Sequence, residues 1–130
     1  MLHHVELYVS NLKRSLEFWE PFLTNLGYHE QQRWPEGVSH LQGETDLCFV
    51  QAPEGHLGSG YHRQRVGLNH LAFHARSRAH VDEVANWVKL AGVASLYEEK
   101  YPYAGGLGYY ALYCEDPDRI KIELVAPADA

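Results

Sequence analysis

The sequence has few cysteines, a deficit of basic residues and no long apolar run. Its two cysteines, Cys48 and Cys114, stand alone in apolar segments without the CxxC spacing of zinc or redox motifs, so we expect two buried free thiols. Lys and Arg number 11 against 17 Asp and Glu, and the net charge of −6 argues against nucleic acid as a partner. No segment approaches the roughly 18 apolar residues of a membrane span, and the N-terminal residues lack a basic region followed by an apolar stretch. We therefore expect a cytoplasmic protein that binds neither nucleic acids nor membranes.

What the chain does contain is an internal repeat. Its 130 residues, 45% of them hydrophobic, are enough for a single domain, residues 1–130. His4 and His70 lie 66 positions apart in similar alternating segments, and Gly27 and Gly92 lie 65 positions apart after similar helical segments. The chain is therefore predicted to hold two copies of one module, residues 1–52 and 67–127, joined by a linker at 53–66.

Each module is predicted to form a strand, a helix and three further strands, which makes the fold α+β. In the first module, apolar residues at steps of three and four place a helix over 12–26, which we expect to bend at Pro21 and to end at Gly27. In the second, Ser77 is expected to cap the helix, which ends at Gly92. Two unrelated α+β units with the same element order remain an alternative. The predicted strands are 2–9, 28–33, 38–42 and 47–52, then 68–75, 94–100, 109–114 and 120–125.

The linker is rich in glycine and ends in a basic segment, residues 62–65. This segment either forms a solvated connection or lies over a cavity and meets an anionic substrate.

Alternation along three predicted strands singles out two imidazoles and one carboxylate. Every second side chain of a strand lies on the same face, so His4, His70 and Glu123 all fall on the face opposite the apolar side chains that would contact the helix. Two histidines and a carboxylate form the ligand set of a facial triad, which leaves coordination positions open for substrate. A strand histidine can also be a hydrogen-bonded packing residue, and alternation alone does not separate the two.

Three segments resemble the vicinal oxygen chelate superfamily, which includes glyoxalase I, fosfomycin-resistance proteins, extradiol dioxygenases and bleomycin-resistance proteins. They are the first strand with the Ser-Leu-Glu-Phe-Trp helix that follows it, the segment 69–73, and the closing segment 110–123, which contains Asp-Pro-Asp. The resemblance covers nearly the whole chain. It implies two βαβββ modules whose eight strands form a curled mixed sheet around a cavity.

The resemblance also implies a metal site. In the metal-dependent members, a divalent ion is bound by the first-strand histidine, its counterpart in the second module and the last-strand glutamate. In this chain these are His4, His70 and Glu123, the residues that alternation had already singled out. Zn, Ni, Mn and Fe all fit such a ligand set.

The chain departs from the family at two positions. Glyoxalase I has a fourth ligand, a glutamate on the last strand of its first module, and two alignments place either Phe49 or Gln51 there. Neither is a carboxylate, which makes glyoxalase I the less similar relative. Arg119 replaces the usual glycine after Asp-Pro-Asp, so the conformation of that turn is open.

Three residues near the expected ligands are candidates for catalysis. Tyr113 lies ten positions before Glu123, a spacing similar to that of the active-site tyrosine of extradiol dioxygenases, and it either donates a hydrogen bond or only walls the cavity. Glu6 and His74 are possible general bases, or partners that hold an imidazole. The glycine- and tyrosine-rich segment 101–110 forms either a mobile lip or a plain turn.

Two functions follow. The first is a metal-dependent enzyme that acts on a small oxygen-chelating substrate by isomerase or lyase, epoxide- or thiol-transfer, or ring-cleaving chemistry. The second is a metal-free protein that sequesters a small molecule, as bleomycin-resistance proteins do. The resemblance also implies a homodimer, in which ligands can come from both subunits.

Overall fold

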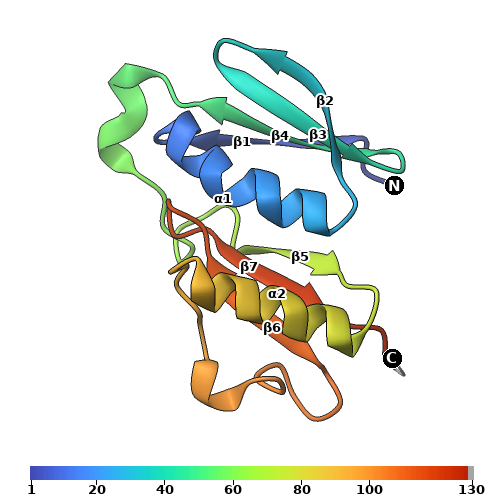
Figure 1. Cartoon of the computed structure of the whole chain (residues 1–130). Helices are drawn as coiled ribbons and strands as arrows, with labels where there is room; N and C mark the ends of the chain where they lie inside the picture. Colours follow the sequence, from blue (N-terminus) through green and yellow to red (C-terminus); the bar gives the residue numbers. More distant parts are fainter. Residues whose placement is uncertain (129–130) are drawn as a thin grey trace. The chain divides into compact units, whose positions relative to one another are not determined.

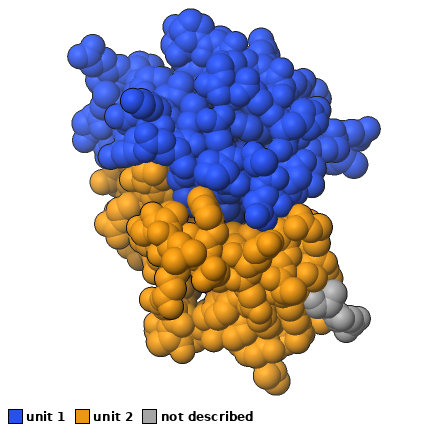
Figure 2. Space-filling model, in the orientation of Figure 1, with its two compact units in different colours: residues 1–60 blue, residues 61–130 orange. Residues whose placement is uncertain are grey.

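The structure, a computed structural model, describes residues 1–128. The chain divides into two compact units, residues 1–60 and the residues from Tyr61 onward (Figure 2). The division lies inside the segment predicted as the linker. Each unit holds one mixed sheet and one long helix, in the α+β class that the sequence predicts (Figure 1).

The first unit has a four-stranded sheet in the order β1-β4-β3-β2. Strand β1 pairs in parallel with β4, whereas β3 pairs antiparallel with both β4 and β2. A parallel pair needs a long crossover connection, and the helix α1 begins that crossover. The elements are β1 (His4–Val9), α1 (Leu12–Asn25), β2 (His29–Trp34), β3 (Gly37–Gln42), β4 (Thr45–Gln51) and a short 3₁₀ helix, η1 (Glu54–Ser59).

Helix α1 begins and ends where the sequence predicts. The side chain of Asn11 accepts a hydrogen bond from Arg14 N and so caps the first turn. At the other end, Gly27 adopts φ 96°, a left-handed conformation that glycine tolerates best. Pro21 lies within the helix, which is one continuous element from Leu12 to Asn25.

The core of the first unit forms where α1 packs on the sheet. Trp19 and Phe49 are both fully buried, with ring centroids 4.6 Å apart. Phe22, Leu23 and Val38 are also fully buried. Burial of each such side chain contributes roughly 1.5–3 kcal/mol, so this cluster holds α1 and β4 together.

The second unit has a three-stranded sheet in the order β5-β7-β6. Strand β5 again pairs in parallel with the last strand of its module, β7, and β6 is antiparallel to β7. Ser77 caps α2 as predicted, because its Oγ accepts a hydrogen bond from His80 N. The elements are β5 (His70–His74), α2 (Arg78–Leu90), a 3₁₀ helix η2 (Glu98–Lys100), β6 (Ala111–Glu115) and β7 (Lys121–Val125).

The strand predicted over residues 94–100 is wrong. Only Ser95 forms a bridge, to Cys114, flanked by backbone hydrogen bonds of Leu96 N to Tyr113 O and of Glu115 N to Ala94 O. Tyr97 then adopts φ 54°, which turns the chain out of the ladder and into η2. The Glu and Lys residues that follow have low strand propensity. Residues 1–128 therefore contain seven strands, not the eight expected.

Within residues 1–128, neither α1 nor α2 nor any shorter helix is long and apolar enough to span a membrane.

Gly37, at the start of β3, provides a test of packing in the first unit. A Cβ atom there would lie 2.4 Å from the indole of Trp34 and 2.9 Å from the carbonyl oxygen of Phe49. We expect Gly37→Ala to lower the free energy of unfolding by about 1–3 kcal/mol, because the added Cβ would clash with the Phe49 carbonyl oxygen, which belongs to the backbone of the paired strand. Gly55→Ala is the matched control, since a Cβ there meets nothing within 4 Å. Urea denaturation measures both, and equal stabilities would contradict this account.

Candidate functional site

The predicted ligands His70 and Glu123 lie together in the second unit. His70 opens β5, Glu123 lies on the adjacent strand β7, and Nε2 of His70 is 3.6 Å from Oε1 of Glu123. Two ligand atoms that are each about 2.1 Å from a shared ion lie at most about 4.2 Å apart, so this separation fits a pair of metal ligands.

The other atoms of both side chains already have partners. Asn69 Oδ1 lies 2.7 Å from Nδ1 of His70, and Asn69 Nδ2 is held by the carbonyl oxygen of Arg63. An amide oxygen only accepts hydrogen bonds, so Nδ1 carries a proton, and in the neutral imidazole Nε2 is then the nitrogen with the lone pair that a metal ion requires. On the other side, the hydroxyl of Tyr109 donates a hydrogen bond to Oε2 of Glu123. Nε2 of His70 and Oε1 of Glu123 are left facing each other.

The carboxylate of Glu123 is buried, with only 5% of the residue exposed. A buried charge needs hydrogen-bond donors, and two tyrosines provide them. One is Tyr109, and the other is Tyr113, which lies directly opposite Glu123 on β6. The pKa of Tyr113 is raised to about 12, mainly by burial of its hydroxyl and, to a smaller extent, by the negative charge of Glu123 and the hydrogen bond between the two side chains. Tyr113 is therefore protonated at neutral pH and acts as a hydrogen-bond donor rather than a base.

Lys121 and Gly105 complete the surroundings of these tyrosines. The ammonium group of Lys121 lies 5.4 Å from the ring centroid of Tyr113 and 5.0 Å from that of Tyr97, whose hydroxyl it also contacts at 3.0 Å. A Cβ on Gly105 would lie 2.6 Å from both the Tyr113 hydroxyl and the Tyr109 ring. A side chain at position 105 would therefore force Tyr109 and Tyr113 to shift.

The remaining predicted residues belong to both units. His4 belongs to β1 of the first unit, where its Nδ1 is 2.9 Å from Nδ1 of His3. Glu6 is exposed on the same strand, and His74 is exposed at the end of β5. Within residues 1–128, no three His, Cys, Asp or Glu side chains are grouped closely enough to hold a metal ion. Of the three predicted ligands, His70 and Glu123 belong to the same unit.

The strand registers identify a residue that sequence alignment missed. In the second unit, Ala72 pairs with Glu123 two positions after His70; in the first unit, Glu6 pairs with Cys48 two positions after His4. Cys48 is therefore the counterpart of Glu123. The two residues that alignment had offered for this position, Phe49 and Gln51, are both wrong.

Both rejected residues have structural roles instead. Phe49 lies on the opposite face of β4, against Trp19. The amide of Gln51 accepts from Leu12 N and donates to the carbonyl of Ser10, which fastens β4 to the start of α1. Alternation along β4 could not have identified Cys48, because Leu47, Cys48 and Phe49 are consecutive apolar residues that are all buried.

Cys48 is a buried thiol with acidic neighbours. Both it and Cys114 are free and buried, as expected from the sequence. Burial raises the pKa of Cys48, and the charges of Asp46 and Glu6 raise it further. The first unit thus places a protonated thiol where the second has a carboxylate.

The reactivity of Cys48 tests this arrangement. Removing an adjacent negative charge lowers a thiol pKa and raises the thiolate fraction, so Glu6→Gln should speed the alkylation of Cys48 by iodoacetamide at pH 8 by about two- to threefold. Glu54→Gln, which alters an exposed carboxylate on η1, should leave the rate unchanged. Mass spectrometry of the Cys48 peptide measures the rate of alkylation. Equal rates in Glu6→Gln and wild type would contradict the placement of Glu6 and Cys48 on the same face of the sheet.

Tyr113 gives a pH-dependent prediction for the metal-free protein. Its pKa of about 12 in the folded state exceeds the unfolded value near 10, so the folded state retains the proton longer. The stability that this provides is fully present below about pH 10 and is lost as the pH rises toward 12. We expect Tyr113→Phe to reduce the slope of unfolding free energy against pH in that window by up to about 1.4 kcal/mol per unit. The unfolding free energy of each protein is expressed relative to its own value at pH 8, which removes the effect of the substitution on packing. Parallel curves of this free energy against pH for Tyr113→Phe and wild type would contradict the prediction.

Known proteins match this chain over nearly its full length. The family model of the Glyoxalase/Bleomycin resistance protein/Dioxygenase superfamily matches residues 1–124. The uncharacterized protein YqjT of Bacillus subtilis is 53% identical over 127 residues, which cover 98% of this chain and 99% of that protein.

Solved structures agree with this assignment. The crystal structure of a presumed glyoxalase from Bacillus halodurans has a TM-score of 0.96 at 50% identity, covering 98% of this chain and 96% of that one. The fosfomycin resistance protein FosX of Listeria monocytogenes has a TM-score of 0.68 at 25% identity, covering 98% and 93%. The chain therefore belongs to the Glyoxalase/Bleomycin resistance protein/Dioxygenase superfamily, the group that its strand histidines and closing motif resemble.

Proposed function

We propose that this protein is a metal-dependent enzyme of the vicinal oxygen chelate type, acting on a small substrate with two neighbouring oxygens. Members of the superfamily often use a divalent metal ion. The observation that supports the proposal is the His70–Glu123 pair, whose Nε2 and Oε1 atoms face each other at 3.6 Å while their remaining atoms are engaged by Asn69 and Tyr109. The contact with Asn69 favours the tautomer in which a neutral His70 offers Nε2 to a metal ion, and metal-binding histidines commonly have such a partner.

The proposed ligands are His4, His70 and Glu123, and the proposed ion is Zn, Ni, Mn or Fe. Such an ion, when bound, supplies Lewis acidity toward the oxygens of the substrate. Imidazole and carboxylate ligands suit each of these metals.

The residues around the pair would then handle protons. Tyr113, protonated at neutral pH, donates a hydrogen bond to a substrate oxygen or keeps Glu123 in place. A base must accept a proton, and the proposed acceptors are Glu6 and His74, both exposed on the ligand strands. Tyr113 cannot fill that role, because its pKa is about 12.

The relatives bear on the reaction. One is described as a presumed glyoxalase and another as a fosfomycin resistance protein. In this chain the counterpart of Glu123 is Cys48, a thiol rather than a second carboxylate, which favours substrate-chelating chemistry over that of glyoxalase I. We propose an isomerase or lyase step, an epoxide or thiol transfer, or an oxidative ring cleavage.

One observation favours a second function, a metal-free protein that sequesters a small molecule. The described part of the chain, residues 1–128, holds no group of three potential metal-binding side chains. Bleomycin-resistance proteins bind their ligands in this way, so a protein that takes up no metal would fit that function.

Metal uptake decides between the two functions. After reconstitution with Zn, Ni, Mn or Fe, we expect wild-type protein to hold about one ion per chain, measured by elemental analysis and calorimetry. His4→Ala, His70→Ala and Glu123→Gln should each weaken binding by at least about tenfold, because each removes a ligand atom.

Two surface variants serve as controls. His56→Ala and Glu99→Gln remove an imidazole and a carboxylate from the 3₁₀ helices and should bind as wild type does. Circular dichroism confirms that every variant is folded. Absence of metal from reconstituted wild type would overturn the enzyme proposal and support the metal-free function.

A further inference from the structure

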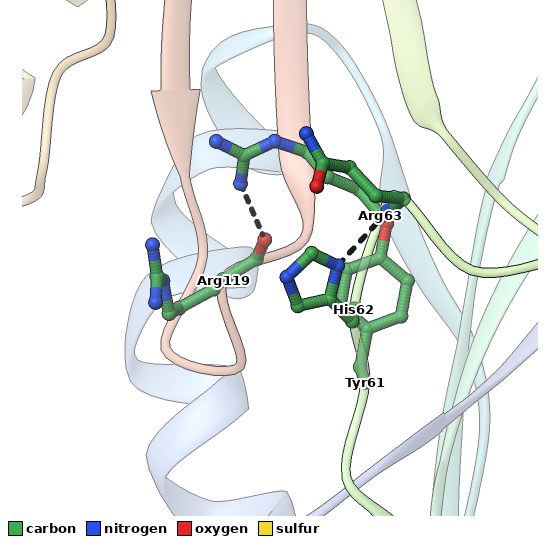
Figure 3. Close-up of a pocket in the computed structure, with 5 residues that line it drawn as sticks. Tyr61, His62, Arg63 and Arg119 are labelled. Atoms are coloured by element: carbon green, nitrogen blue, oxygen red, sulfur yellow. Dashed lines mark hydrogen bonds between the residues drawn. The ribbon is translucent and has the colours of Figure 1, made fainter.

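A small polar pocket lies in the second unit, apart from the side chains of the His70–Glu123 pair. Its volume is about 210 Å³, and residues from the start of the second unit and from the turn before β7 line it (Figure 3). Cavities that enclose a whole drug-sized ligand measure about 300–1,000 Å³, so this one suits a single chemical group. The lining residues are Tyr61, His62, Arg63, Gln64 and Arg119.

Two guanidinium groups at this pocket share one carboxylate. Nη1 of Arg63 lies 2.6 Å from Oε2 of Glu115, and Nε of Arg119 lies 3.5 Å from the same oxygen. Glu115 is 9% exposed and Arg63 is 25% exposed, so this pair is largely withdrawn from water. Two guanidinium groups thus meet at this pocket, in a chain whose net charge is −6.

The backbone holds Arg119 in an uncommon conformation. Its φ is 67°, in the left-handed region where a Cβ atom crowds the carbonyl oxygen and glycine is favoured. The turn itself is fixed by Asp116, whose Oδ1 accepts hydrogen bonds from the backbone of Asp118 and Ile120. The arginine therefore contributes charge at a position where its backbone is unfavourable, which is typical of functional sites.

The linker side of the pocket is also ordered. Arg63 Nη1 donates to the carbonyl of Arg119 at 3.4 Å, and the backbone of Gln64 donates to Nδ1 of His62 at 3.1 Å (Figure 3). Because Nδ1 accepts, the ring proton lies on Nε2, which makes that nitrogen a donor. The hydroxyl of Tyr61 donates to the carbonyl of Leu68 and anchors the loop.

We propose that this pocket binds an anionic group, a phosphate or a carboxylate, through Arg119, Arg63 and the Nε2 donor of His62. Guanidinium groups present paired donors that match the oxygens of both anions. Acidic groups also lie close by, since Glu115 pairs with both guanidinium groups and the charge of Asp116 helps to raise the pKa of Tyr61, so an anion would be bound through the directed N–H donors rather than through an excess of positive charge. The proposal concerns the metal-free protein and does not depend on the proposed enzymatic function.

Titration with inorganic phosphate tests the proposal. Calorimetry or amide chemical shifts of metal-free wild type, at low ionic strength, should show saturable binding with shifts in residues 61–65 and 119. Chloride at equal ionic strength should not compete. A second titration with succinate separates a phosphate site from a carboxylate site, and saturation by either anion supports the proposal.

Substitutions at Arg119 separate charge from conformation. Arg119→Gly removes the charge and relieves the backbone, so it should weaken phosphate binding at least tenfold while raising the midpoint of thermal unfolding. Arg119→Lys keeps the charge at the same backbone cost and should stay within about fivefold of wild type. If Arg119→Gly binds phosphate as tightly as wild type, or if wild type binds neither anion saturably, the proposal is overturned.

Discussion

The parallel pairing of the first and last strands in each module is the constraint on which the candidate site depends. A parallel pair cannot be closed by a tight turn, so the chain must cross over through a helix and two further strand segments before the last strand returns. In the second unit this pairing sets His70 and Glu123 on neighbouring strands, with their side chains on the same face. A shift of the register by one residue would turn Glu123 toward α2 and remove the site.

The buried carboxylate of Glu123 explains much of what surrounds it. An ion removed from water is stable only if donors replace its hydration, and the second unit supplies Tyr109 from a glycine-rich loop and Tyr113 from β6. The same contacts raise the pKa of Tyr113 and so define it as a donor. The burial and hydrogen bonds that hold the Glu123 carboxylate therefore also keep the hydroxyl of Tyr113 protonated.

The two modules share a plan but differ in the chemistry they place on it. Where the second has Glu123, the first has Cys48, and where the second has Tyr113, the first has Ser39, because β3 pairs with β4 as β6 pairs with β7. The repeat is also incomplete in its strands. The first strand after α2 is reduced to a bridge at Ser95, and the chain that it releases forms the segment carrying Tyr109. Because no full strand forms there, the chain before β6 forms the loop from which Tyr109 contacts the carboxylate.

The sequence by itself determined the features that depend on local periodicity. The Ser77 cap, the glycine ends of both helices, the α+β class, the faces of β1, β5 and β7 and the candidate ligands His4, His70 and Glu123 all follow from alternation, helical spacing and resemblance. Only the tertiary structure decided which residues oppose one another. Strand register assigned Cys48 in place of Phe49 or Gln51, the left-handed Tyr97 ended an expected strand, and long-range contacts brought Tyr109 to Glu123 and Arg119 to Arg63. Such contacts join residues far apart in the chain, and no local pattern encodes the partner that each one meets.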